Sequence, residues 1–456
     1  MSADMYHAEA AHGPDIPEYT SKSLTDDMVR RYQNPAPTLR TWTLITGVLL
    51  LIGIVGLVLK VVFATPSTGW GWAAATFAFI FCTAVSAPMS AVATRLAKGD
   101  WRRSFTRPAE AFTAVAVLVV LLSIPLLIVL PTRLPEQRTV WFNWPGSPWV
   151  YDFLALLGLA VVGLGMFVVS AVPDWAALRD RGIDGPFIGR AARWAGALKQ
   201  WRVTRSALTP LGAMYLAMYI FSGMLIATDF SMALVPGWID AIYPAQFSIS
   251  GLQAGIATLI IALGFYRRFG YSEYVRLDQF WGLAKLLLAF SLLWFYFWWS
   301  AFILFWYGRK PAEIQLLQLL MFGPYGIPFL LAFFGNFVLP LLILMWNPIR
   351  KSIRGPIVVA CIVLFGNFMN NVRLFVGPWS LPQHGGELVE VMPAFQWPDL
   401  ADILIIPGFI GGAVFFYLVA LRVVPRLNLW EMKEGLLYRA VRKYLLGQVV
   451  VVGKPE

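Results

Sequence analysis

The sequence is poor in charge: only 13% of its 456 residues are Asp, Glu, Lys or Arg, whereas 58% are hydrophobic. A soluble domain carries roughly 25% charged residues, so the composition argues against a chain of soluble domains. Uncharged runs alternate with short basic stretches, which is the pattern of helical membrane proteins. We therefore expect an all-α polytopic membrane protein.

Side chains that bind metals are also scarce. The two cysteines, Cys82 and Cys361, lie in apolar runs, and the three histidines, His7, His12 and His384, lie outside them. Two cysteines cannot complete a four-ligand metal site, and no histidine is placed to bind haem within the membrane. There is no CxxCH haem motif, P-loop or dinucleotide fingerprint. We expect neither metal nor haem, so electrons from any redox reaction must pass to a neighbouring subunit.

Ten runs are long enough to cross a bilayer, which needs about 20 apolar residues. They divide the chain into an N-terminal segment (1–41), a membrane domain (42–422) and a C-terminal tail (423–456). The predicted spans are 42–64, 71–94, 111–130, 150–171, 207–228, 247–266, 283–306, 325–346, 355–376 and 401–421.

The positive charges predict an orientation for these spans. If the N-terminus is inside, thirty of the 36 lysines and arginines fall in inner segments, five fall in outer ones, and Arg373 lies within the ninth span. Basic segments stay on the cytoplasmic side, so both termini are predicted to be cytoplasmic. The net charge of +11 thus reflects orientation and contact with membrane lipid, and we expect no nucleic-acid partner.

Ionisable residues inside a membrane are costly and are therefore candidates for function. Five lie toward the outer ends of predicted spans: Asp152, Asp229, Arg373, Asp399 and Asp402. Asp152 is either an interfacial carboxylate or a proton acceptor beside a cavity, and Asp229 is either a proton acceptor or a turn cap. Arg373 either pairs with a carboxylate or with carbonyl groups, or it contacts a ligand.

Two further polar features have similar alternatives. Glu110, just inside the third span, either pairs with Arg107 or marks the mouth of a proton path. The asparagines at 367, 370 and 371 either join helices by hydrogen bonds or contact a polar headgroup, the first being commoner.

Five fragments occur in an order that resembles the NrfD/PsrC family, and within it the ActC subunit of alternative complex III. They are WRRSFTRPAEAFT (101–113), SPWVYDF (147–153), PDWAALRDRG (173–182), DFSMALVPGW (229–238) and GNFVLP (335–340). The resemblance implies two four-helix bundles with flanking helices, no haem, and a quinol, such as menaquinol, bound near the outer face. It also implies electron transfer to an iron–sulfur partner in a bacterial inner membrane.

Residues carry over from this resemblance by position. Asp152 and Asp229 match acidic residues near the family's quinol pocket and proton route, with Trp149 and Tyr151 beside the first. Arg373 matches an arginine of the penultimate conserved span. The family's PGW turn is Pro236, Gly237 and Trp238. The implied partners are an iron–sulfur or molybdopterin-like subunit, cytochrome c subunits and a second NrfD-like membrane subunit.

The sequence departs from the family at positions that usually hold histidine. Leu127 and Ile128 replace one near the end of the third span, Ile239 replaces one after PGW, and a third is replaced near Gly223. Val372 replaces a glutamate before the arginine. Because leucine and isoleucine cannot accept a quinol proton, a non-catalytic anchor of the same fold stays open as an alternative. A transporter is the third alternative, although few charges lie near the membrane midplane.

Overall fold

The computed structural model describes residues 19–63, 65–130, 142, 144–185, 187–381, 388–389, 391–444 and 447–452. Within them, ten helices are long and apolar enough to cross a membrane, which confirms the predicted all-α polytopic fold. Each overlaps one predicted span, and several run further. The fifth begins at Leu198 rather than 207 and the seventh at Leu277 rather than 283, because a helix continues past the bilayer wherever its polar end stays hydrogen-bonded.

The labels η1, η4 and η7 mark 3₁₀ turns, as do η3 (Asp100–Arg102) and η6 (Ile188–Ala191) between spans, whereas η2, η8, η9, η10 and η11 mark π turns. The spans follow one another along the chain. They are α3 (Pro37–Val62); η1 (Ser67–Trp70), α4 (Gly71–Ile80), η2 (Phe81–Val85) and α5 (Pro88–Leu96); α6 (Thr106–Glu110), η4 (Ala111–Ala114) and α7 (Val115–Val129); α8 (Trp149–Arg179); α9 (Leu198–Asp229) and 3₁₀ turn η7 (Met232–Leu234); α10 (Tyr243–Tyr266) and η8 (Arg267–Tyr271); α11 (Leu277–Gly308); α13 (Gly326–Phe333), η10 (Phe334–Val338) and α14 (Leu339–Leu344); α16 (Arg354–Asn371), η11 (Val372–Val376) and α17 (Gly377–Trp379); and α18 (Leu400–Val423).

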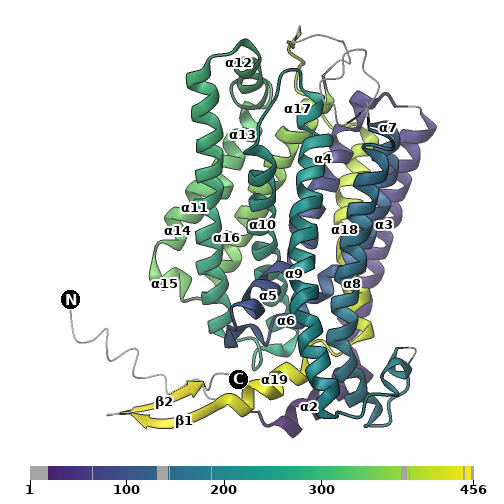
Figure 1. Cartoon of the computed structure of the whole chain (residues 1–456), viewed down its shortest axis with the longest axis vertical. Helices are drawn as coiled ribbons and strands as arrows, with labels where there is room; N and C mark the ends of the chain where they lie inside the picture. The colour runs from purple at the N-terminus through teal and green to yellow at the C-terminus, as the bar shows by residue number, and fades with distance from the viewer. Residues whose placement is uncertain are drawn as a thin grey trace.

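The remaining elements cap the two ends of the bundle (Figure 1). They are α2 (Ser21–Gln33), α12 (Pro311–Leu317) with π turn η9 (Gln318–Phe322), α15 (Asn347–Arg350), α19 (Leu429–Tyr438), and the strands β1 (Arg439–Tyr444) and β2 (Gly447–Val452). We call the end with α2, α15 and α19 the basic end, and the end with α12 and α17 the opposite end. The described parts of all segments predicted to be inner lie at the basic end.

The spans pack as two sets joined through the middle. α8 and α9 pack together with α7 beside α8, and α10 packs with α11 and α16. The second span is 94% buried along its apolar window and lies centrally, whereas α3 is only 22% buried and packs along α18 at the periphery. A Cβ added to Gly408 would lie 2.3 Å from Gly53 Cα, so glycines allow the α3–α18 backbones to touch.

One feature of the C-terminal tail differs from the prediction of helices alone. Strands β1 and β2 pair antiparallel after α19, with Arg439 opposite Val452. The ribbon lies at the basic end, outside the ten spans (Figure 1). The all-α description therefore holds for the membrane domain and not for the tail.

Candidate functional site

Two carboxyl groups from neighbouring spans meet inside the bundle. Asp152 lies in the first turn of α8 and Asp229 is the last residue of α9, and both are buried, with 1% and 0% of their surface exposed. The side chains of Asp152 and Asp229 are close enough to interact with each other. Neither oxygen of Asp152 receives a hydrogen bond from an N–H or a hydroxyl among the described residues. Ionising both of two neighbouring buried carboxyls is costly, so this arrangement is suited to binding a proton.

The aromatic residues beside Asp152 point elsewhere. Trp149 and Tyr151 are 44% and 39% exposed, whereas Asp152 is 1% exposed. Tyr151 is adjacent to Asp152 on the helix and so faces a different direction, and Trp149 is the first residue of α8. The structure therefore brings together Asp152 and Asp229 from the predicted set, and leaves Trp149 and Tyr151 on the outer surface of the bundle.

The PGW turn and Arg373 meet at a second place, in the other set of spans. Gly237 adopts a φ of +71°, a left-handed conformation that suits glycine, and the turn directs Trp238 inward against Tyr243 at 4.5 Å between ring centroids. Arg373 lies in η11 and is 2% exposed. π turns widen a helix locally and are frequent at functional sites.

Arg373 has an unusual set of partners for a buried cation. Its Nε donates to Asn370 Oδ1 at 3.0 Å, and its guanidinium lies 5.4 Å from the centre of the Phe329 ring. No carboxylate within the described part of the chain forms an ion pair with it, in contrast to one of the predicted pairings. A buried charge needs compensation, so a ligand that carries oxygen atoms would be favoured here.

A cavity of about 30 Å³ adjoins Arg373 at the opposite end of the bundle, which is room for about two water-sized groups. Four buried polar atoms on its lining side chains form no hydrogen bond of ordinary geometry with the described residues: Trp238 Nε1, the Tyr243 hydroxyl, Gln246 Nε2 and Trp298 Nε1. Asp240 also lines it, and burial raises the pKa of this loop carboxyl even though the Ile242 and Tyr243 backbone N–H groups donate to it.

A third cluster, at the basic end, joins two of the sequence fragments. Glu110 accepts from Arg95 at 2.6 Å and lies 3.3 Å from Arg107, which in turn donates to Asp174 at 2.7 Å. Arg95 also donates to Glu431 of α19 at 3.0 Å. The predicted Arg107–Glu110 pair is therefore present, within a larger network of buried ion pairs. The fragments around 101–113 and 173–182 interlock here, which explains their charges structurally.

A family comparison covers the Asp152–Asp229 pair, the Arg373 cavity and the third cluster apart from Glu431. The model of the family described as polysulphide reductase, NrfD, matches residues 60–377. The chain belongs to the NrfD family. NrfD proteins are membrane subunits of polysulfide-reductase-type complexes, which agrees with the ten spans. A search of curated proteins finds no match.

Two predicted candidates of this NrfD chain form a separate ion-pair cluster. Lys60 Nζ lies 2.9 Å from Asp402 and 3.1 Å from Asp399, and it donates to the Gly69 carbonyl at 2.7 Å. Sequence reasoning considered the two aspartates and missed their partner. The position of Lys60 near the end of an apolar run could have indicated it, because a buried lysine needs a counter-charge as much as a buried aspartate does.

The span asparagines act mainly within the protein. Asn367 Nδ2 donates to Ser250 Oγ at 2.9 Å, and Asn371 Nδ2 donates to the Asn367 carbonyl at 2.8 Å. Gln253 Nε2 donates to the Asn336 carbonyl at 2.7 Å, which places the GNFVLP fragment in the same network. These bonds join α10, α16 and η10 and favour the helix-joining interpretation.

The positions at which the resemblance implies histidines differ in their surroundings. A Cβ added at Gly223 would lie 2.9 Å from Ser248 Oγ, so this NrfD chain has closed the space that a larger side chain would need. Leu127 is buried, whereas Ile128 and Ile239 are exposed. The three histidines of the sequence, His7, His12 and His384, lie outside the described residues.

Proposed function

We propose that this chain is the quinol-interacting membrane subunit of a multisubunit electron-transfer complex, and that Asp152 and Asp229 accept protons from the quinol. The carrying observation is the proximity of the buried Asp152 and Asp229 carboxyls, where no N–H or hydroxyl of the described residues donates to Asp152. A pair that holds one proton can take up a second at little electrostatic cost, because both groups are then neutral. One of the two carboxyls can then ionise again and release its proton toward the opposite end of the bundle.

The reaction balances with a partner that takes electrons. Oxidation of a quinol to a quinone releases two electrons and two protons, and the chain has no motif that would bind a redox centre of its own. The electrons would pass singly to an iron–sulfur subunit docked at the opposite end. The protons would pass one after the other through the Asp152–Asp229 pair.

The Arg373 cavity suits a quinone oxygen atom that accepts hydrogen bonds. Arg373 together with Trp238, Gln246 and Trp298 presents N–H groups, and quinone carbonyls accept hydrogen bonds. The cavity admits an oxygen atom rather than a ring, because its volume is about 30 Å³. We propose that Arg373 and Trp238 contact the quinone headgroup, separately from the proton-accepting pair. For Trp149, Tyr151, Pro236 and Gly237 we propose only that they shape the surrounding surface.

The assignment to a branch within the NrfD family rests on the order of the five sequence fragments. We propose the ActC branch of alternative complex III, in a bacterial inner membrane, with menaquinol as substrate and both termini cytoplasmic. The partners would be iron–sulfur or molybdopterin-like and cytochrome c subunits and a second NrfD-like subunit. Glu110 is proposed to serve a proton path only if protons cross the membrane, since two arginines neutralise it at present.

The test uses the intact complex purified from its native membrane. Asp152→Asn and Asp229→Asn should each slow quinol-dependent reduction of the partner cluster about 100-fold, the usual contribution of a positioned proton acceptor. Asp184→Asn, at an exposed loop position, is the matched control and should react normally. Unchanged turnover in both pair variants would rule out the proposed role.

A non-catalytic anchor is the second candidate, favoured by the residues that stand where the resemblance implies histidine: Leu127, Ile128, Gly223 and Ile239. The two candidates differ in quinone content. The quinol-interacting subunit should retain quinone in stoichiometric amount after gentle purification, and Arg373→Gln should lower that amount. An anchor should retain none above the level of bulk lipid, in wild type and variant alike.

A further inference from the structure

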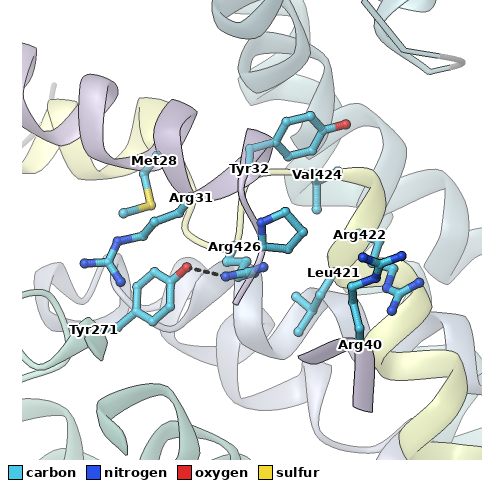
Figure 2. A pocket seen from close by; sticks show the side chains of 10 residues that line it. Met28, Arg31, Tyr32, Arg40, Tyr271, Leu421, Arg422, Val424 and Arg426 are labelled. Atoms are coloured by element: carbon cyan, nitrogen blue, oxygen red, sulfur yellow. Dashed lines mark hydrogen bonds between the residues drawn. The ribbon is translucent and has the colours of Figure 1, made fainter. Parts of the chain in front are cut away.

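Arginines line a pocket at the basic end, between α2 and the ends of α3 and α18 (Figure 2). The pocket has a volume of about 190 Å³. Its lining includes Arg31 of α2, Arg40 in the first turn of α3, Arg422 in the last turn of α18, and Arg426 just beyond that helix. Two regions that are distant in sequence, 31–40 and 422–426, thus bring four arginines to the lining of one pocket.

The acidic groups around this basic pocket do not balance it. Arg31 pairs with Asp27 at 2.8 Å and lies over the Tyr271 ring, whereas Arg426 donates to the Tyr271 hydroxyl at 2.9 Å. Arg40, Arg422 and Arg426 form no ion pair with any carboxylate in the described ranges. The pocket lining itself contains no acidic residue. Like charges held together repel, so an anion between them would lower the energy of the folded protein.

An apolar groove continues from the pocket into the membrane region. Arg422 lines both hollows, and the second, of about 490 Å³, lies between α3 and α18. Leu44, Val48 and Leu51 form one wall at helical spacing and are 72%, 56% and 62% exposed. Phe415 of α18 lies opposite, and Gly47 keeps the floor open, since a Cβ there would lie 3.3 Å from the Phe415 ring.

We propose that the basic pocket and this groove form a binding site for one anionic phospholipid. The phosphate oxygens would accept from the guanidinium groups, which match oxyanions with paired N–H donors. An acyl chain would lie along Leu44, Val48 and Leu51. Arg40 and Arg422 end their spans at the level where headgroups lie, and basic pockets between membrane helices suit such headgroups.

The chemistry selects this occupant over a zwitterionic lipid or a free anion. A zwitterionic headgroup brings a cation into a pocket that already has an excess of positive charge. A free phosphate would leave the adjacent groove unexplained. The bound lipid would hold α2 against the ends of α3 and α18, so it would stabilise the basic end as a unit.

The test uses the full-length chain, in its complex, stripped of lipid in detergent. Dioleoylphosphatidylglycerol should raise the thermal unfolding midpoint, and dioleoylphosphatidylcholine should raise it less. Arg40→Gln combined with Arg422→Gln should weaken the phosphatidylglycerol effect at least tenfold in the concentration required. Arg350→Gln combined with Arg354→Gln removes two charges elsewhere at the basic end and should leave the effect unchanged.

Two further measurements separate lipid from free anion. Val48→Trp should fill the groove and weaken the phosphatidylglycerol effect, without changing the midpoint in phosphatidylcholine. Inorganic phosphate should give little stabilisation at matched ionic strength. The proposal is overturned if the wild type does not distinguish the two lipids, if both arginine pairs respond equally, or if phosphate alone reproduces the whole effect.

Discussion

At the residue scale, buried charges in this chain differ by their partners rather than by their own type. Asp402 is paired with Lys60, and Glu110 with two arginines, whereas Asp152 faces another carboxyl. All three are acids at the edge of an apolar run. The sequence predicts that each is a candidate, and it cannot separate them, because their partners lie in spans that are far away along the chain.

Lys60 provides the first prediction. Lys60→Met should destabilise the protein by about 3–5 kcal/mol, because it leaves Asp402 buried without its cation. The midpoint of denaturant unfolding in detergent measures this loss. The double variant Lys60→Met with Asp402→Asn should recover part of it. Equal stability of wild type and Lys60→Met would show that Asp402 does not depend on the lysine.

The carboxyl pair provides the opposite prediction for stability. Asp152→Asn removes one of two like groups. Its free energy of unfolding should therefore stay within about 1 kcal/mol of the wild-type value or rise above it. The same measurement serves for both variants. Loss of quinol turnover together with retained stability would mark Asp152 as kept for its chemistry, whereas a large loss of stability would indicate a structural role.

At the element scale, hydrophobic runs predict the ten spans because bilayer thickness fixes their length. The helix ends could not be predicted, since Leu198 and Leu277 begin helices outside the apolar runs. The β1–β2 ribbon was also not predicted. Its valine-rich second half, GQVVVV, favours a strand, but one strand carries no information about whether a partner will pair with it.

Glycine contacts between elements give the third prediction. A Cβ at Gly335 would lie 2.6 Å from Gly366 Cα, so α16 and η10 touch through their backbones. Gly335→Ala should therefore cost about 1–3 kcal/mol, through forced separation of the two elements. Gly165→Ala in α8 is the control, because nothing lies within 4 Å of an added Cβ there. Similar midpoints for the two variants would contradict the close crossing.

At the scale of the whole molecule, α19 fastens the tail to the membrane domain through Glu431. Burial tends to raise the pKa of Glu431, but the charges of Arg95 and Arg102 outweigh burial and lower it below the ordinary 4.5. A lowered pKa in the folded state means that this stabilisation is complete above about pH 4.5 and is lost as the pH falls through the folded value. Wild type should lose stability in that acidic window more steeply than Glu431→Gln, as measured by unfolding midpoints against pH.

The arrangement of the ten spans also fixes which segments share a face of the membrane. Ser23 and Ser272 are exposed at the basic end, and Lys310 is exposed at the opposite end. An even number of crossings places α2 and α19 together, and the arginine-rich segments beside them should face the cytoplasm. In a cysteine-free background, Lys310→Cys should react with a membrane-impermeant maleimide in intact cells. Ser23→Cys and Ser272→Cys should react only after the membrane is opened. Labelling of Ser272→Cys in intact cells would reverse the orientation, and the carboxyl pair would then release its protons toward the cytoplasm.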